Sequence, residues 1–342
     1  MIDLLGTPRE ALVRELVAVG VRPARAAHLF RVLHRSRGVT DLTPDLTGLE
    51  GKAVLATAEL TESHRTDDGT EKLVFTLADG ARIESVLVPM KLDRTTLCVS
   101  TQVGCAMACA FCATGTLGLK RSLTAGEILA QIHTARDHAT AQGRAVGRLV
   151  FMGMGEPLHH YDATRDALHV LLDRLGAGFG SKSIMVSTVG LVPKMRRFSE
   201  DFGGRVGLAL SLHAGTDATR LRIIPTARAT PLADIRAALL DHPLPGSRYL
   251  MLEYVVLPGV NDTDEELDGV AAFVDGLYAV VNLIPFNPFA GAEFRTPTSD
   301  EVWAVHQGLR DRGVPAWIRW PRGRGAHGAC GQLALQSPEE TV

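Results

Sequence analysis

From Thr95 onward, apolar β-prone segments alternate with segments of helical periodicity, and this alternation constrains the fold more than any other feature. The expected strands are TTLCVST, RLVFMG, SIMVST, VGLALSL, LMLEYVVL, AVVNLIPF and PAWIRW, and the expected helices include ALHVLLDRL, ADIRAALL, ELDGVAAFVDGL and EVWAVHQGLR. Repeated strand-then-helix order favours parallel strands joined by crossover helices. We therefore predict an α/β fold with a partial (β/α)6 barrel over residues 95–342.

The first part of the chain lacks this alternation and divides into two regions. Residues 1–57 have helical periodicity, with Leu12, Val13, Leu16 and Val17 on one face, and predict a small N-terminal helical domain. Several arginines give this domain a basic bias, which fits either a nucleic-acid-binding surface or a solvated helix face. In residues 58–94, two Asp-Gly turn signals separate short β-prone runs, which predicts a β-hairpin linking region.

Composition narrows the class of protein. The 342 residues are 46% hydrophobic and 22% charged, as is usual for a folded globular chain. No stretch approaches the roughly 20 apolar residues of a membrane span, and the N-terminus lacks the layout of a signal peptide. We therefore expect a cytoplasmic protein with no membrane partner. Because the net charge is −2, any nucleic-acid-binding surface must be a local basic patch.

Three of the five cysteines form a compact group. Cys105, Cys109 and Cys112 have the spacing C-x3-C-x2-C. Three thiolates on one loop can hold three irons of a [4Fe–4S] cluster, which usually takes four cysteines, and leave the fourth iron open. An open metal position serves chemistry, whereas closed sites are structural. The alternative is a structural zinc site in an RNA-binding module, although zinc sites more often use two separated cysteine pairs.

Polar residues also gather at the ends of the expected strands. They are Gly155, Glu156, Ser187, Ser211, His213 and Asn287. The carboxyl ends of parallel strands form the rim where such barrels bind ligands. Each residue alone has a simpler interpretation, such as a turn at Gly155, a helix cap at Ser187 or a turn at Asn287. Their recurrence at several strand ends predicts a ligand site at this rim.

These motifs together resemble a known family. C-x3-C-x2-C with an aromatic residue before the third cysteine is typical of the radical S-adenosylmethionine (SAM) superfamily, and within it the chain resembles the RlmN/Cfr family of RNA adenine methyltransferases. The resemblance extends from about Leu5 to Leu333. It is carried by TLCVSTQVGCAMACAFCATG, FMGMGEPL, STVGLVP, LSLHA, EYVVLPGVND, NLIPFNPF and ACGQL. It implies a radical SAM barrel that carries a [4Fe–4S] cluster and binds SAM.

The resemblance also implies a role for each matching position. The cluster would be bound by Cys105, Cys109 and Cys112, and SAM by Gly155, Glu156, Ser187, Ser211, Leu212, His213 and Asn287. Cys330 would become S-methylated, and Cys98 would be the second catalytic cysteine. Glu84 would accept the proton from the base, although one extra residue separates it from Cys98 relative to the family pattern.

The chemistry implied by the resemblance consumes two SAM molecules per turnover. One methylates the Cys330 sulfur, and the other is cleaved to a deoxyadenosyl radical that removes a hydrogen from the new methyl group. The carbon radical adds to the adenine, Glu84 removes the ring proton, and Cys98 attacks Cys330 to release the RNA and leave a disulfide. The expected product is adenosine methylated at C2 in 23S rRNA, with tRNA as a further substrate.

Three alternatives stay open at this point: methylation at C8, a radical SAM methyltransferase acting on another substrate, and the zinc-stabilised module. We expect a monomer that takes electrons from a donor such as flavodoxin or ferredoxin. Arg319, Trp320, Arg322 and Arg324 combine charge with an aromatic ring and are candidates for RNA contact. Two segments, residues 226–229 and 324–328, depart from the family pattern and bear on the choice of substrate.

Overall fold

The computed structural model describes residues 1–35, 46–90 and 94–335. The strands are β1 (Ile2–Asp3), β2 (Ala53–Val54), β3 (Ala58–Arg65), β4 (Glu71–Leu77), β5 (Arg82–Pro89), β6 (Arg94–Cys98), β7 (Gln102–Gly104), β8 (Leu119–Ser122), β9 (Ala145–Phe151), β10 (Ile184–Thr188), β11 (Gly207–Ser211), β12 (Leu250–Val256), β13 (Ala279–Pro285) and β14 (Ala316–Ile318). The helices are α1 (Arg9–Ala18), α2 (Pro23–Arg35), α4 (Ala113–Thr116), α5 (Ala125–Ala141), α6 (Tyr161–Leu172), α7 (Val192–Phe202), α8 (Asp217–Ile223), α9 (Leu232–Leu240), α10 (Asp264–Val274) and α11 (Ser299–Asp311), with short 3-10 helices η1 (Ser181–Ser183), η2 (Pro225–Ala229) and η3 (Arg324–Ala326).

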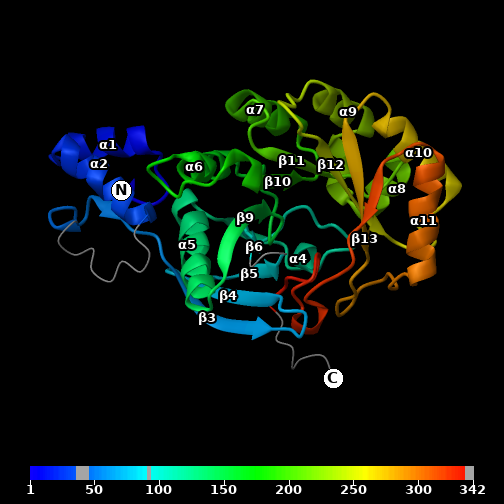
Figure 1. Ribbon diagram of the computed structural model, residues 1–342, viewed down its shortest axis with the longest axis horizontal. Helices are drawn as coiled ribbons and strands as arrows, with labels where there is room; N and C mark the ends of the chain where they lie inside the picture. Colours follow the sequence, from blue (N-terminus) through cyan, green and yellow to red (C-terminus); the bar gives the residue numbers. More distant parts are fainter. Residues whose placement is uncertain (36–45, 91–93, 336–342) are drawn as a thin grey trace.

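One ten-stranded sheet forms the centre of the molecule (Figure 1), in the order β14-β13-β12-β11-β10-β9-β6-β5-β4-β3. The seven strands from β6 to β14 in this order pair in parallel, because crossover helices return the chain to the same edge. Six strand–helix units begin at β6, β9, β10, β11, β12 and β13. The predicted (β/α)6 fold class is therefore confirmed, and β14 follows the six units as a seventh parallel strand.

The expected hairpin is present as β4 and β5, but it belongs to a larger unit. β3 pairs with β4 in antiparallel fashion, and β5 pairs with β6, so this region extends the barrel sheet directly. β3 was not expected because its sequence, AELTESHR, is mostly polar and exposes every second residue. The division of the chain into domains at residues 57 and 94 stays a prediction. The predicted domains contain residues 36–45, 91–93 and 336–342, which lie outside the described residues.

Helix α7 was also missed from the sequence. It buries Met195, Phe198 and Phe202 among charged residues, so its apolar stripe is only three residues long. The start of α5 has a capping box: the Thr124 side chain accepts from the Glu127 amide, and the Glu127 side chain accepts from the Thr124 amide. None of the helices in the described ranges is long and apolar enough to cross a membrane.

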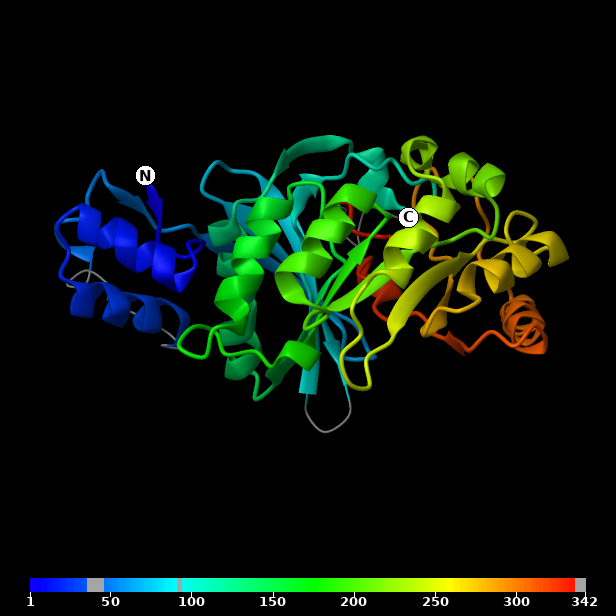
Figure 2. The same ribbon diagram turned by 90° about the horizontal axis from the view of Figure 1, so that it is seen from above.

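The N-terminal helices lie at one end of the molecule, and α10 and α11 lie at the other (Figure 2). Leu12 and Leu16 of α1 are buried as expected. Val17, which the sequence places on the same face, is 41% exposed. Asp3 connects the N-terminal helical region to the barrel, because its Oδ2 accepts a hydrogen bond of 3.0 Å from the amide of Gly126 in the first turn of α5.

Two histidines, the buried His34 and the half-buried His133, lie between α2 and α5. The His34 Nδ1 and His133 Nε2 atoms are 3.2 Å apart, so one ring donates to the other. Burial lowers the pKa of His34 to about 3 and that of His133 to about 4, because no opposite charge compensates for desolvation. Both rings are therefore neutral in the folded protein at neutral pH, whereas the unfolded chain protonates them below about pH 6.5.

We predict that this pair makes the protein sensitive to acid. The unfolded state binds more protons than the folded state below about pH 6.5, so stability should fall as the pH drops from there towards the folded pKa values. The expected loss is about 1.5 kcal/mol for each histidine, and so about 3 kcal/mol for the pair, between about pH 6.5 and about pH 5. In thermal unfolding measured against pH, His34→Phe should reduce this loss, whereas His28→Phe, at an exposed position of the same helix, should keep the wild-type slope.

Candidate active site

The cysteine loop is held between two short strands. β7 ends at Gly104, directly before Cys105, and pairs with β8 beyond the loop. Gly104 has a φ of +79°, and a Cβ atom there would lie 1.8 Å from the carbonyl oxygen of Gly118. The Cys105 amide donates to that same oxygen over 3.0 Å. Only glycine fits this close approach, so Gly104 fixes the start of the loop.

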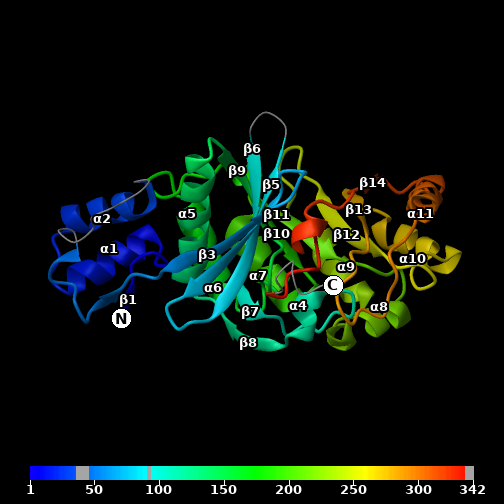
Figure 3. The same ribbon diagram turned by 90° about the horizontal axis from the view of Figure 1, so that it is seen from below.

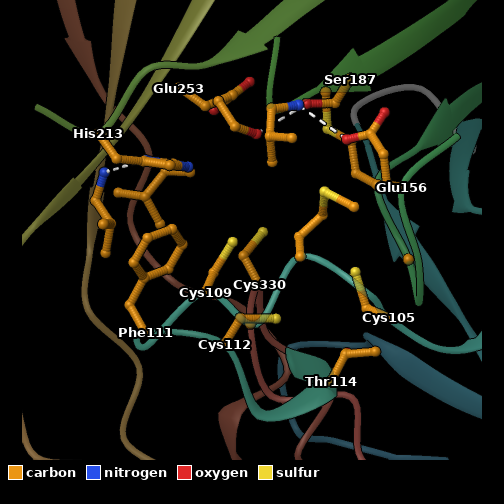
Figure 4. A pocket seen from close by; sticks show the side chains of 18 of the residues that line it. Cys105, Cys109, Phe111, Cys112, Thr114, Glu156, Ser187, His213, Glu253 and Cys330 are labelled. Carbon is orange, nitrogen blue, oxygen red and sulfur yellow. Dashed lines mark hydrogen bonds between the residues drawn. The ribbon is translucent and has the colours of Figure 1, made fainter. Parts of the chain in front are cut away.

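The three predicted cluster cysteines line one cavity at the rim of the barrel, which we call the rim cavity. Figure 4 shows their sulfur atoms directed into it, together with that of Cys330. Of the other predicted residues, Gly155, Glu156, Ser187, Ser211, His213 and Asn287 also line it. Within the described residues, no three His, Cys, Asp or Glu side chains are close enough to share a single metal ion. The sulfur atoms instead surround a space.

The donor set of the rim cavity fits an iron–sulfur cluster. Burial raises the pKa of Cys105 to about 12 and raises those of Cys109 and Cys112 as well. Thiolates in such surroundings need a cationic partner to offset the cost of their charge. Three soft sulfur ligands on one loop suit iron, and they leave one position of a cubic cluster without a cysteine.

Glu156 faces the rim cavity on a sharply turned backbone. The preceding Gly155 has a φ of +102°, and a Cβ atom there would lie 2.5 Å from the Gln102 side chain. The Glu156 carboxylate accepts hydrogen bonds from the amides of Val189 and Leu158, at 2.8 and 2.9 Å. Burial nevertheless raises the pKa of Glu156 to about 7. A buried carboxylate of this kind suits a cationic group of a ligand, such as an amine.

The adjacent strand ends supply polar atoms beside Glu156. The Ser187 and Ser211 hydroxyl oxygens are 3.3 Å apart across β10 and β11. His213 has a φ of +60° and accepts a hydrogen bond at Nδ1 from the Val255 amide, and burial lowers its pKa to about 3. Its neutral ring lies edge-on to Phe111 with the ring centroids 4.5 Å apart. Leu212 lies between Ser211 and His213 in sequence, but its side chain packs into the hydrophobic core.

Residues 328–335, which we call the strap, place Cys330 at the mouth of the rim cavity. The strap lies beside α4 and β13 in two views (Figures 1 and 3). Four hydrogen bonds hold the strap to the rim. In α4, the Ala113 backbone amide donates to the Gly331 carbonyl (2.7 Å) and the Thr114 hydroxyl donates to the Leu333 carbonyl (2.6 Å). After β13, the Asn287 side-chain amide donates to the Cys330 carbonyl (3.0 Å), and the Gln332 side-chain amide donates to the Pro288 carbonyl (2.7 Å). The Cys330 side chain is exposed.

Asn287 connects the strap to one of the segments that depart from the family pattern. Its Nδ2 donates to the Cys330 carbonyl, while its Oδ1 accepts from Arg324 Nε at 2.7 Å. Arg324 also donates to the Phe286 carbonyl. This side chain, considered as an RNA contact from the sequence, is thus engaged within the protein. Segment 226–229 also lies near the site, since the Thr226 hydroxyl donates to the sulfur of Met107 in the cysteine loop over 3.7 Å.

A second cavity, the sheet cavity, shares walls with the first. It is lined by Cys98 and Cys330, among others, and Asn287, Cys112 and Arg319 line both cavities. The structure thus brings Cys98 and Cys330 to one space although they are far apart in sequence. Burial raises the pKa of Cys98 to about 12, with a further contribution from the neighbouring Cys330, while Arg319 opposes the rise. The cationic Arg319 therefore favours thiolate formation at Cys98.

Glu253 was missed from the sequence although it lines both cavities. Its carboxylate accepts from Asn282 Nδ2 over 2.7 Å, and burial raises its pKa. The nearby Cys330, followed by Glu253 and Cys98, raises the pKa of Arg319, which remains cationic. A single Glu inside the apolar strand LMLEYVVL was the signal that could have identified this position, because charged residues are rarely buried without a role or a partner.

Glu84 lies apart from the other predicted residues. Glu84 is not one of the described residues that line the rim cavity or the sheet cavity. Its side chain is fully buried in an ion pair with Lys72 and accepts from the Leu335 amide of the strap. Of the other candidates for RNA contact, Trp320 is 45% exposed and lines the sheet cavity, and Arg322 also lines it while donating to the Pro89 carbonyl.

Comparison with known proteins agrees with this geometry. The model of the Radical SAM superfamily matches residues 99–271. The chain is 42% identical to the dual-specificity RNA methyltransferase RlmN of Anaeromyxobacter dehalogenans, covering 98% of this chain and 92% of the relative, and 41% identical to that of Pelobacter propionicus, covering 97% and 95%. A radical SAM methyltransferase from Sphaerobacter thermophilus has a similar structure, with a TM-score of 0.90 and 39% identity over 98% of this chain and 100% of the other.

A barrel with three cysteines around a rim cavity and a matching family model defines a radical SAM enzyme. At about 40% identity over nearly the whole length of its relatives, the chain belongs to the RlmN family of RNA methyltransferases within that superfamily.

We predict that Gly104→Ala lowers the iron and sulfide content of the reconstituted protein severalfold, because the added Cβ displaces the backbone that carries Cys105. Gly118→Ala is the matched control. It has a similar φ of +63° but nothing within 4 Å of the added atom, so it should cost about 1 kcal/mol of stability and retain its iron. Equal iron loss in both variants would contradict the steric explanation.

Proposed function

We propose that this chain methylates C2 of an adenosine in RNA, with 23S rRNA as the primary substrate and tRNA as a second one. One observation carries the proposal: the strap positions Cys330 between the rim cavity, which contains the three cluster cysteines, and the sheet cavity, which contains Cys98. A methyl carrier must meet the methyl donor on one side and the acceptor base on the other. Of the two cysteines proposed for catalysis, Cys330 lines both spaces, whereas Cys98 lines the sheet cavity.

Cys105, Cys109 and Cys112 would hold the [4Fe–4S] cluster in the rim cavity. Glu156 would orient SAM through its amino group, and Ser187, Ser211 and His213 would contact the rest of that molecule. Asn287 is engaged with the strap and with Arg324, so we propose that it positions Cys330 while it lines the SAM site. With both groups bound, the rim cavity supplies a 5′-deoxyadenosyl radical.

The residues of this chain perform the remaining steps. Cys330 Sγ accepts a methyl group and later carries it, after loss of one hydrogen, to the ring carbon of the target adenine. Glu84 takes the proton from that carbon. Cys98 then attacks Cys330 Sγ, and the bond between this sulfur and the methylene carbon breaks. The carbon leaves with the bonding pair and takes up a proton, so that the RNA is released with a methyl group and a Cys98–Cys330 disulfide remains. Reduction of this disulfide and of the cluster requires an external donor, for which flavodoxin or ferredoxin is suitable.

The sheet cavity suits the entry of a splayed RNA base. Arg148, Lys182 and Arg248 line it together with the aromatic rings of Tyr249 and Trp320. Recognition of single-stranded RNA commonly combines phosphate contacts by cations with stacking of bases on aromatic rings. These residues form a local basic region on a chain whose net charge is −2.

Nucleoside mass spectrometry tests the reaction. The chain is expressed in cells without their own enzyme of this family, and 23S rRNA and tRNA are digested separately. We expect 2-methyladenosine with the wild-type chain and none with Cys330→Ala. Detection of 8-methyladenosine would overturn the C2 assignment. If neither product forms although the enzyme still cleaves SAM, the chain acts on another substrate. Segments 226–229 and 324–328, which depart from the family pattern, would then account for the different specificity.

The role of Cys98 has its own test. Because Cys98 performs the releasing step, Cys98→Ala should retain methylation of Cys330 but accumulate RNA covalently attached to the protein. The adduct is measured as a band of labelled RNA that is shifted on a denaturing gel and removed by protease. A Cys98→Ala variant that turns over freely, or that is inactive without forming any adduct, would contradict the assignment.

A further inference from the structure

Two oppositely charged side chains are buried together on β4 and β5. Lys72 Nζ lies 2.9 Å from Glu84 Oε1, and the two side chains are 1% and 0% exposed. Charged residues are seldom buried this completely unless they are paired, and a pair in such a place is commonly no more stable than an apolar substitute. The pair therefore calls for an explanation other than stability.

The pair lies on the face of the sheet that carries Cys98. Lys72 is opposite Val86 in the register of β4 and β5, and Val86 is opposite Cys98 in that of β5 and β6. Because side chains alternate between the two faces of a strand, Glu84, two residues before Val86, projects from the same face. Val86 and Cys98 both line the sheet cavity.

The strap crosses this pair. A Cβ atom at Gly328 would lie 3.5 Å from the Lys72 Cβ and 3.7 Å from Val86, so the start of the strap packs beside Lys72. At its other end, the Leu335 amide donates to Glu84 Oε2 over 3.1 Å. Cys330 lies between these two contacts along the strap. The two carboxylate oxygens thus have different partners: Lys72 contacts Oε1, and the Leu335 amide of the strap contacts Oε2.

We propose that Lys72 is a positioning residue for proton transfer: it holds Glu84 through Oε1, so that Oε2 becomes the proton acceptor when the Leu335 amide moves away. This inference rests on the proposed function. In the step concerned, the C–H bond at the methylated ring carbon of the protein–RNA adduct breaks, the proton goes to Oε2, and the electron pair stays in the ring. The adduct has an unpaired electron after the carbon radical adds to the ring, and this electron passes to an external one-electron carrier such as oxidised flavodoxin or ferredoxin. Lys72 keeps its own protons throughout, and its ammonium offsets the charge of the buried carboxylate before the transfer.

The test separates three partial activities: methylation of Cys330 by peptide mass, formation of 5′-deoxyadenosine, and release of RNA on a denaturing gel. Lys72→Met should keep the first two within about twofold but slow release of methylated RNA by about tenfold to a hundredfold, so that the adduct accumulates. Lys72→Arg should restore release in large part, because it keeps the positive charge. Lys72→Gln retains a hydrogen-bond donor for Glu84 and should accumulate the adduct even if Lys72→Met does not fold.

Glu71→Gln is the matched control, because Glu71 is equally buried next to Lys72 on β4 but projects from the other face, where it pairs with Arg144. It should reduce stability without accumulating the adduct. Wild-type release of RNA by folded Lys72→Met or Lys72→Gln would overturn the role of Lys72, as would a parallel loss of all three activities like that of a destabilised control. If the wild-type enzyme forms no methyladenosine in any RNA, the proposed function itself is overturned.

Discussion

The hydrogen bonds that hold the strap against the barrel rim are the constraint on which the site depends. Cys330 lies on a segment with little regular structure, and its position is set by contacts of the strap with Ala113, Thr114, Asn287 and Pro288. Ala113 and Thr114 directly follow the last cluster cysteine, so the cysteine loop and the strap are fixed to each other. Backbone groups of a buried loop must find partners, and here those partners belong to the site itself.

The site combines buried charge of both signs with little solvent to screen it. Burial raises the pKa values of the Cys105 and Cys109 thiols in the rim cavity, and it also raises the pKa of the Glu156 carboxyl. Arg319 lines both cavities and provides a positive charge near Cys330 and Cys98. Such an arrangement is costly for the protein alone, and cationic groups bound in the cavities would offset that cost.

The sequence predicted the barrel well because each strand is a short apolar run followed by a helix. It failed for β3, whose alternating polar residues suit an edge strand, and for α7, whose buried stripe is short. The grouping of Cys105, Cys109 and Cys112 at one site could be expected from their local spacing alone, and all three line the rim cavity. The connection of Asn287 to Arg324, and the burial of Glu84 with Lys72, could not, because both depend on pairings between residues distant in the chain.

The central claim is that Cys330 carries the methyl group. The most direct measurement is the mass of the peptide that contains Cys330, taken from protein purified with an intact cluster and incubated with SAM bearing a deuterated methyl group. If Cys330 carries the methyl group, this peptide should gain one CD3 group in place of the thiol hydrogen, located on sulfur by fragmentation, while the Cys98 peptide gains none. A Cys330 peptide that stays unmodified in protein that methylates RNA would contradict it.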